Sequence, residues 1–263
     1  MTPDPRRSGA FEYRYPHPPV RVLFLARPNR YLARVRFPGF GGIVPVHVPN
    51  PGRMRELLVP GRTVGWVVPA PGAHRKTRFD LVSVRHRGVG VSIDSHLANR
   101  LVGRVLAAGG LPEFGPGPWR SACPYGGSRF DFGVPSGSRG GYRALLEVKS
   151  SNLRSGDWAL FPDAPTLRGL RHLRHLTEAA RSGISAGVLF AVQRDDVRRF
   201  RPNDSLDPMF GRALRDARAA GVRLAAVALE VRPGWVGWGR RLPVRLPGPL
   251  RASDRTYLAV GSD

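Results

Sequence analysis

The stretch from Gly127 to Ser151 constrains the fold of this chain more than any other. Residues 129–134 and 142–150 are apolar or alternating, and the PSGSRGG segment between them has the composition of a turn. Two strand-like runs joined by turn residues predict a β-hairpin. Side chains from both runs therefore meet in one place.

The predicted hairpin carries one carboxylate on each strand. Asp131 lies in the first strand, and Glu147 follows the apolar run Ala-Leu-Leu in the second. Side chains alternate along a strand, so Glu147 and Lys149 project from one face and Val148 from the other. Charges at the end of a buried strand need partners.

This combination of residues fits metal-assisted phosphodiester hydrolysis. Asp131 and Glu147 offer hard oxygen ligands to Mg²⁺ or Mn²⁺, and the Val148 carbonyl can add another. Lys149 would orient or help deprotonate the attacking water and offset phosphate charge. The alternative is an ordinary strand that ends in a salt-bridged Glu and Lys, and the triplet by itself leaves both interpretations open.

The use of lysine favours the functional interpretation. Of the 42 Lys and Arg residues 40 are arginine, and lysine occurs only at Lys76 and Lys149. A compact, titratable ammonium group does what a planar guanidinium group cannot. Retention of lysine at position 149 therefore indicates a chemical role.

The positive charge points to a polyanionic partner. The formal net charge is +23, with 42 cationic and 19 acidic residues spread along the chain. A preference for Arg over Lys explains which cation is used but not this excess. Nucleic acid is the simplest partner, with affinity that falls as salt rises. RNA stays open, although no RRM-type aromatic motif is present.

Two features that the sequence lacks limit the cellular location and the cysteine chemistry that we expect. No apolar run reaches transmembrane length, and the start MTPDPRRSGA has no signal-peptide character, so we expect a cytoplasmic protein without a membrane partner. Cys123 is the single cysteine, which excludes an internal disulfide and a thiolate zinc cluster.

The first part of the chain predicts a small closed barrel. After a loose arm over residues 1–18, residues 19–92 form an oligonucleotide-binding (OB) type of barrel in this interpretation. Pro and Gly breakers separate its predicted strands, which cover residues 20–25, 31–37, 42–48, 62–68 and 79–87.

Two segments of the barrel carry polar residues of interest. In the second strand Arg34 and Arg36 alternate with apolar residues, which suits either nucleic-acid binding or a solvated face. In the turn VHVPNPGRMREL, Asn50 and Arg53 can contact phosphate, or the turn is only a structural corner. A short helix is predicted over residues 53–58.

Residues 93–246 predict a second domain of mixed α/β character. A helix capped by Asp94 or Ser95 precedes the hairpin, and a second helix begins at Pro165 or Thr166 and ends at Gly183. Its leucines, from Leu167 onward, predict a buried face. A strand over 186–193, a helix from Asp207 and a strand over 222–231 complete a mixed sheet flanked by helices. Residues 247–263 are expected to form a flexible tail.

The charged residues of the second helix surround its leucine face. Arg168 and His172 belong to this set, and we expect both to be exposed, where they can contact phosphate. A solvated charged face is the plain alternative, and a ligand role for His172 is the less favoured one.

Several segments together resemble the sugar fermentation stimulation protein A family. These are RPNRYLARV, HVPNPGRM, ANRLV, SRFDF, LLEVKS, FPDAPTLRGLRHL, VQRDD and FRPNDSLDPMF, and they run from about Phe24 to Leu246. The resemblance implies an N-terminal OB barrel joined to a restriction-endonuclease-like domain of the PD-(D/E)xK type. It also implies DNA binding and a link to the regulation of sugar metabolism, especially that of maltose.

The resemblance also assigns roles to residues. It matches Asp131 and Glu147 to the motif carboxylates and Lys149 to the motif lysine. Where the family has an acidic residue before SRxDF, this chain has Ala122, which weakens the case for cleavage. We therefore expect a DNA-binding protein, with an active Mg²⁺-dependent nuclease as the alternative. The expected nucleic-acid contacts are Arg30, Arg34, Arg36, Asn50, Arg53, Arg129, Arg168 and His172.

Overall fold

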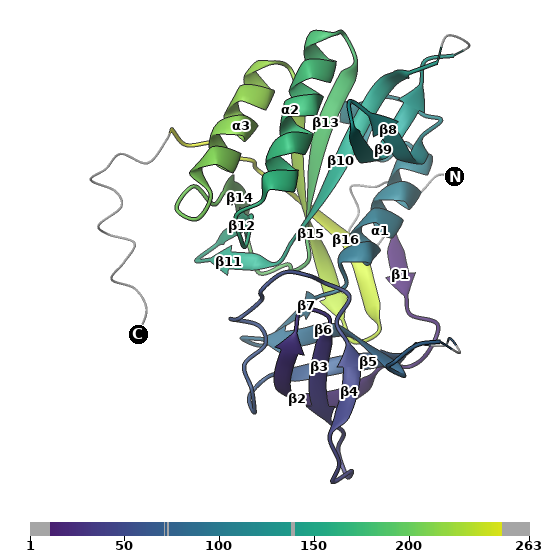
Figure 1. Cartoon of the computed structure of the whole chain (residues 1–263), viewed down its shortest axis with the longest axis vertical. Helices are drawn as coiled ribbons and strands as arrows, with labels where there is room; N and C mark the ends of the chain where they lie inside the picture. Colours follow the sequence, from purple (N-terminus) through teal and green to yellow (C-terminus); the bar gives the residue numbers. More distant parts are fainter. Residues whose placement is uncertain (1–10, 71, 73, 138–139, 249–263) are drawn as a thin grey trace.

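The computed structural model describes all residues except 1–10, 71, 73, 138–139 and 249–263. It contains a barrel at one end and a larger sheet with helices on both faces at the other (Figure 1). This confirms the predicted mixed α/β fold class, with an OB-like barrel followed by a mixed-sheet domain. Within the described residues, no helix is long and apolar enough to cross a membrane.

The barrel is built from strands β2 to β6, with β7 as an extension. The strand order is β4-β3-β2-β5-β6-β7, and a pairing of His47 with Asp80 joins β4 to β6 and closes the ring. The strands are β2 (Val20–Asn29), β3 (Leu32–Arg36), β4 (Val44–His47), β5 (Val64–Pro69), β6 (Phe79–His86) and β7 (Val89–Ser92). Alternation of β3 buries Ala33 and Val35 and exposes Arg34 and Arg36, as expected.

The second domain centres on a sheet with the order β1-β16-β15-β13-β10-β9-β8. Strands β10, β13 and β15 are parallel, and the outer pairs are antiparallel. The strands are β1 (Glu12–Arg14), β8 (Arg120–Tyr125), β9 (Ser128–Pro135), β10 (Tyr142–Ser151), β13 (Ser185–Val192), β15 (Arg223–Arg232) and β16 (Trp235–Leu242). A small second sheet contains β11 (Leu153–Ser155), β12 (Trp158–Phe161) and β14 (Arg199–Pro202).

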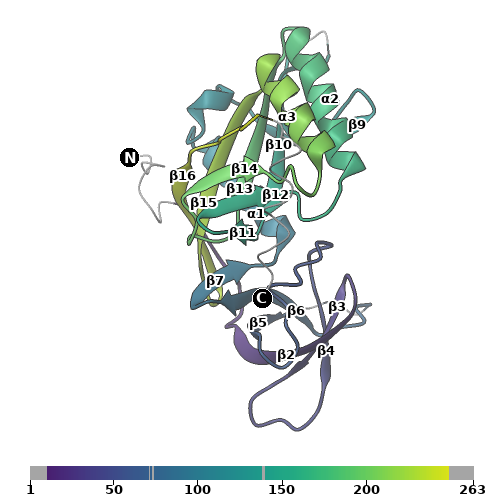
Figure 2. The same cartoon turned by 90° about the vertical axis from the view of Figure 1, so that its left-hand side faces the viewer.

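Each face of the large sheet is covered by its own core. Helices α2 (Leu167–Arg181) and α3 (Pro208–Ala219) lie side by side on one face (Figure 2). Helix α1 (Ser95–Ala107) and the 3₁₀ turn Pro112–Phe114 cover the other face. The sequence sets the helix starts, because Asp94, Thr166 and Asp207 each accept main-chain hydrogen bonds as N-caps.

Two local predictions are wrong. The expected loose arm contains β1, which pairs with β16 through Glu12 to Gly237, while residues 1–10 lie outside the described part. The segment 53–58 forms a single turn rather than a helix, in which Leu58 N–H donates to Met54 O. Met54 has φ of 47°, a left-handed conformation that a helix cannot continue through.

Candidate metal and nucleic-acid site

The predicted hairpin exists, and it brings the two carboxylates together. Strands β9 and β10 are antiparallel, with Leu145 opposite Gly133 and Leu146 opposite Phe132. The paired ladder ends there, and the next link between the strands is made by a side chain, because the Val148 N–H of β10 donates to the Asp131 carboxylate of β9 at 2.8 Å. Asp131 and Glu147 lie close enough for the negative charge of Glu147 to raise the pKa of Asp131.

Asp131 is held by donors from two elements. Its Oδ1 accepts from the Asn99 amide of α1 at 2.6 Å, and its Oδ2 accepts from the Val148 N–H of β10 at 2.8 Å. Burial, together with the negative charge of Glu147, raises the pKa of Asp131 to about 6. No local sequence pattern marks Asn99, because its partner lies 32 residues away.

Glu147 is 4% exposed and has two cationic or polar partners on one oxygen. Its Oε1 accepts from Lys149 Nζ at 2.5 Å and lies 2.6 Å from His172 Nδ1. Burial alone would raise the pKa of Glu147, but the hydrogen bond with His172 and the positive charge of Lys149 outweigh it and lower the pKa below its usual value. The contact with Lys149 confirms that both side chains share one face.

The second carboxylate oxygen of Glu147 has no partner. Within the residues that the structure describes, Oε2 is buried and makes no hydrogen bond. An unpaired buried carboxylate oxygen is costly unless something else binds it. This atom is therefore the clearest sign of a ligand at the hairpin.

His172 is not on the exposed face where it was expected. It is 2% exposed, and it lies in the core between Glu147 and the Phe130 ring, with ring centroids 5.5 Å apart. The buried stripe of α2 runs through Gly169, His172 and Leu176 rather than through Leu167, which is 86% exposed. Spacings of three and four residues along this stripe were the signal that could have placed His172 inward.

Asn50 also differs from its expected role. It is 8% exposed, and its Oδ1 accepts from the Gly52 N–H at 2.8 Å. Asn50 therefore stabilises the turn, which supports the structural-corner alternative. The remaining expected nucleic-acid residues are exposed, on the barrel and around the second domain: Arg30, Arg34, Arg36, Arg53, Arg129 and Arg168.

An arginine that sequence reasoning missed orders the same turn. Arg27 donates to the carbonyl groups of Gly52 and Arg53 at 2.7 Å and also to those of Arg30 and Asn50. The Arg53 N–H in turn donates to Oδ2 of Asp163 at 3.1 Å, which joins the barrel to the segment before α2.

A cavity of about 210 Å³ lies between this turn and the end of β10. Its lining includes residues 50–52 of the barrel and residues 150–153, which follow directly after Lys149. The barrel turn is therefore held next to the hairpin that carries the carboxylates.

Ala122 lies on β8, next to the position of Asp131 on β9. Ser121 is opposite Phe132 and Cys123 is opposite Phe130, so Ala122 lies opposite Asp131 on β8. Its φ of 60° is unusual for a residue other than glycine. An alanine at this position supplies no ligand atom from its side chain.

The residues present fit one hard divalent cation held by few protein ligands. Asp131 and Glu147 supply carboxylate oxygens, and the unpartnered Oε2 of Glu147 is available. In the described part of the chain no group of three or more His, Cys, Asp or Glu could hold a metal ion. Such a site leaves several coordination positions to water or substrate, as Mg²⁺ prefers.

Comparison with known families agrees with this architecture. The model of the sugar fermentation stimulation protein RE domain matches residues 96–235, and that of the SfsA N-terminal OB domain matches residues 25–93. The two matches fall on the mixed-sheet domain and on the barrel.

Similar proteins extend over most of the chain. Sugar fermentation stimulation protein homologs of Desulforamulus reducens and Symbiobacterium thermophilum are 40% and 43% identical, over 86% of this chain and 92% and 95% of theirs. The structure of Pyrococcus furiosus SfsA in complex with Ca²⁺ has a TM-score of 0.78 and 30% identity, and the match covers 89% of this chain and 98% of that one. This chain belongs to the sugar fermentation stimulation protein family.

Proposed function

We propose that this protein binds DNA and holds a divalent cation at Asp131 and Glu147. The observation that carries the proposal is the buried Oε2 of Glu147, which has no partner among the described residues and lies beside Asp131 in a chain whose net charge is +23. A buried carboxylate beside a partly buried one, in so basic a protein, is better suited to a cation than to a polyanion alone. The surrounding arginines would attract phosphates to this cation.

Mg²⁺ and Mn²⁺ are the proposed cations. When bound, such a cation would neutralise phosphate charge and lower the pKa of a coordinated water. The residues of this chain prepare the site for it: His172 and Lys149 hold Glu147 ionised, and Asn99 and the Val148 N–H fix the Asp131 carboxylate. The Ca²⁺ complex of the Pyrococcus furiosus relative supports a divalent ion in this fold.

Binding experiments test both parts of the proposal. We expect duplex DNA to bind with an affinity that falls steeply between 50 and 300 mM salt, measured by fluorescence anisotropy. We expect Mn²⁺ to bind by calorimetry, and Glu147→Gln to abolish Mn²⁺ binding while DNA binding in EDTA persists. DNA binding that is absent at low salt, or Mn²⁺ affinity unchanged in Glu147→Gln, contradicts the corresponding part.

A second candidate function is phosphodiester hydrolysis, and the position of Lys149 favours it. Its ammonium group is 2.5 Å from Glu147 and 12% exposed, so it can reach a water or phosphate at the carboxylates. We expect supercoiled, linear or single-stranded DNA to be cut with Mg²⁺ or Mn²⁺ and not with EDTA. Cleavage should vanish in Lys149→Ala and persist in Lys76→Ala, the exposed lysine that lies outside the site.

The proposal includes a regulatory link to sugar metabolism. It rests on the name shared by the relatives and not on any residue of the site. Deletion of the gene followed by measurement of transcripts for sugar use, with maltose among the carbon sources, tests this part. Unchanged transcripts on every sugar contradict it without affecting the binding proposal.

A further inference from the structure

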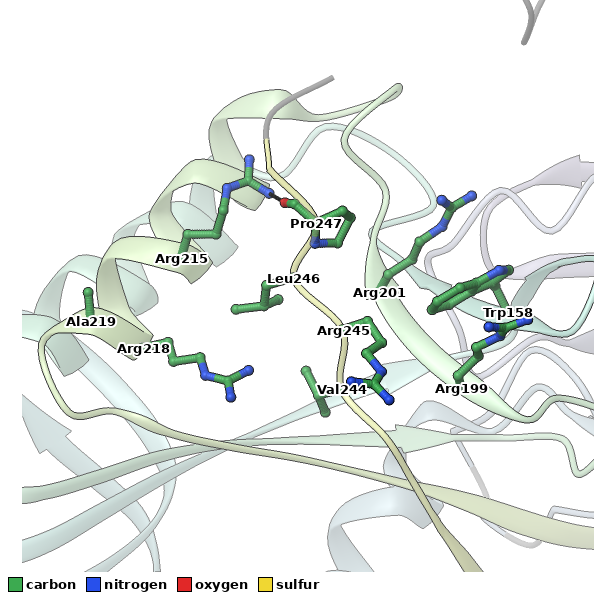
Figure 3. Close-up of a pocket in the computed structure, with 10 residues that line it drawn as sticks. All are labelled: Trp158, Arg199, Arg201, Arg215, Arg218, Ala219, Val244, Arg245, Leu246 and Pro247. Carbon is green, nitrogen blue, oxygen red and sulfur yellow. Dashed lines mark hydrogen bonds between the residues drawn. The ribbon is translucent and has the colours of Figure 1, made fainter. Parts of the chain in front are cut away.

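An open, arginine-lined cavity lies apart from the carboxylate site. Its volume is about 940 Å³, and its walls come from β12, β14, the end of α3 and the segment 244–247 after β16 (Figure 3). None of these elements contributes Asp131, Glu147, Lys149 or His172. The cavity therefore needs an explanation of its own.

The walls of this cavity are strongly basic and contain no acidic residue. Five arginines line it: Arg199, Arg201, Arg215, Arg218 and Arg245. Two of them are neutralised nearby, because Arg215 pairs with Asp204 at 3.0 Å and Arg199 with Asp157 at 2.9 Å. Among the described residues, Arg201, Arg218 and Arg245 have no carboxylate within ion-pair distance.

Trp158 orders two of these guanidinium groups. The Cζ atoms of Arg199 and Arg201 lie 4.3 and 5.0 Å from the centroid of its ring. Cation–π contacts of this kind hold long side chains in place at little cost, so less freedom is lost when a ligand binds. Figure 3 shows both arginines beside the tryptophan, with Arg245 projecting toward them from the segment 244–247 and Arg218 on the other side of that segment.

Apolar atoms complete the lining. Val244 and Leu246 line the cavity from the segment 244–247, and Arg215 donates to the carbonyl group of Pro247 at 3.1 Å, which fixes this segment against α3. Guanidinium groups on opposite walls with an apolar floor suit a chain of phosphates whose sugars or bases contact the floor.

We infer that this cavity binds the phosphates of a nucleic-acid strand, as a second contact region distinct from the hairpin site. A strand is favoured over a free nucleotide because the cavity is open, whereas sites for small ligands enclose most of the ligand surface. The inference rests on the proposed DNA binding and extends it to the surface formed by β12, β14, the end of α3 and the segment 244–247. Contacts at both regions would lengthen the footprint on the strand.

The test compares two charge-matched variants of the full chain. Arg218→Gln with Arg245→Gln removes two unpaired cations from the cavity, and Arg62→Gln with Arg181→Gln removes two exposed arginines that belong to neither contact region. Affinity for single-stranded and duplex DNA is measured against KCl concentration. The slope of log affinity against log salt concentration becomes shallower by about 0.7 to 0.9 for each phosphate contact that is lost. We therefore expect this slope to become shallower by about 1.4 to 1.8 in the cavity variant, and by much less in the control variant.

A variant that keeps the charge gives an independent readout. Trp158→Leu removes the ring that orders Arg199 and Arg201, and we expect DNA affinity to fall about threefold or more at constant net charge. Thermal unfolding of each variant establishes that it is folded before binding is compared.

The outcomes separate the inference from the proposed function. If the wild-type protein binds no DNA, the proposed function fails. If it binds and the cavity and control variants lose slope equally, the cavity inference alone is overturned. Binding of inorganic tripolyphosphate that disappears in the cavity variant, with DNA affinity unchanged, also overturns it and indicates a free phosphorylated ligand.

Discussion

Nδ1 of His172 lies 2.6 Å from Oε1 of Glu147, and this contact joins helix α2 to the end of strand β10. Both side chains are buried, so the pair is protected from water and its geometry is set by the packing of the helix on the sheet. Because Oε1 is shared by His172 and Lys149, the partners of Glu147 are gathered on one oxygen and Oε2 is left for another ligand.

Replacement of His172 should weaken cation binding. In His172→Ala, Glu147 loses a partner that orients it and keeps it ionised, and we expect Mn²⁺ affinity to fall by about 10- to 100-fold. Calorimetry measures this. His175→Ala is the matched control, because His175 lies on the same helix and contacts Ser128 Oγ at 2.8 Å instead of a carboxylate. Equal Mn²⁺ affinity in both variants would contradict the positioning role.

Asp131→Asn should stabilise the metal-free protein. Burial and the charge of Glu147 raise the pKa of Asp131 to about 6 from 3.8, so the folded state holds this proton more tightly than the unfolded state. The free energy of unfolding therefore falls as pH rises from about 4 to about 6. Above that range the ionised Asp131 carboxylate continues to destabilise the folded state. We expect a gain of about 1 to 3 kcal/mol at pH 7.5, measured by urea unfolding in EDTA.

At a second carboxylate, Asp196, we expect the same kind of substitution to change the free energy of unfolding in the opposite direction. Asp196 pairs with the fully buried Arg194 at 2.6 Å, and Asp196→Asn should lower the free energy of unfolding because the arginine loses its charged partner. A loss of stability in Asp131→Asn of similar size would show that the Asp131 charge is well compensated, against the prediction.

Local patterns in the sequence predicted much of the fold because its signals act over short distances. Capping by Asp94 and Thr166 starts two helices, and alternation in β3 separates Arg34 from the core. The missed features depend on contacts between distant residues. β1 forms because β16 offers an edge more than 200 residues later, and no local pattern shows it.

The candidate site divides in the same way. The Asp131, Glu147 and Lys149 set could be predicted because a hairpin and a two-residue spacing bring these residues near one another: Lys149 contacts Glu147, and the charge of Glu147 raises the pKa of Asp131. The sequence pattern indicates no role for Asn99 and predicts an exposed position for His172, because the partner of each residue lies on another element. For His172 the rotation of α2 about its axis is decisive, because it turns His172 toward the core and leaves Leu167, in the first turn, exposed to solvent.

Ala122→Glu should strengthen cation binding. Ser121 and Cys123 pair with Phe132 and Phe130, the two neighbours of Asp131, so position 122 lies beside Asp131. A third carboxylate would raise the ligand charge, and we expect Mn²⁺ affinity to increase about tenfold. Ala122→Gln is the control of similar size without the charge. If both variants bind Mn²⁺ equally, or neither differs from the wild type, position 122 does not reach the cation.

His86 should make the contact between barrel and sheet sensitive to acid. Arg194 Nη2 donates to His86 Nδ1 at 3.1 Å, which requires that nitrogen to be unprotonated. Burial first, then the positive charges of Arg194, Arg87 and Arg154, lower the pKa of His86 against the opposing pull of Asp196. The folded state therefore binds this proton less readily than the unfolded state, and stability present above about pH 6.5 is lost as pH falls.

His86→Gln tests this without removing the polar contact, because glutamine can accept from Arg194 and does not titrate. We expect the midpoint of thermal unfolding to fall less between pH 7.5 and pH 5 in this variant than in the wild type. His96→Gln, at an exposed position on α1, should leave the pH dependence unchanged. If His86→Gln follows the wild-type curve, the acid sensitivity arises elsewhere. A flattened curve in His86→Gln alone assigns it to the hydrogen bond between β6 and Arg194, and so to the junction of the two domains.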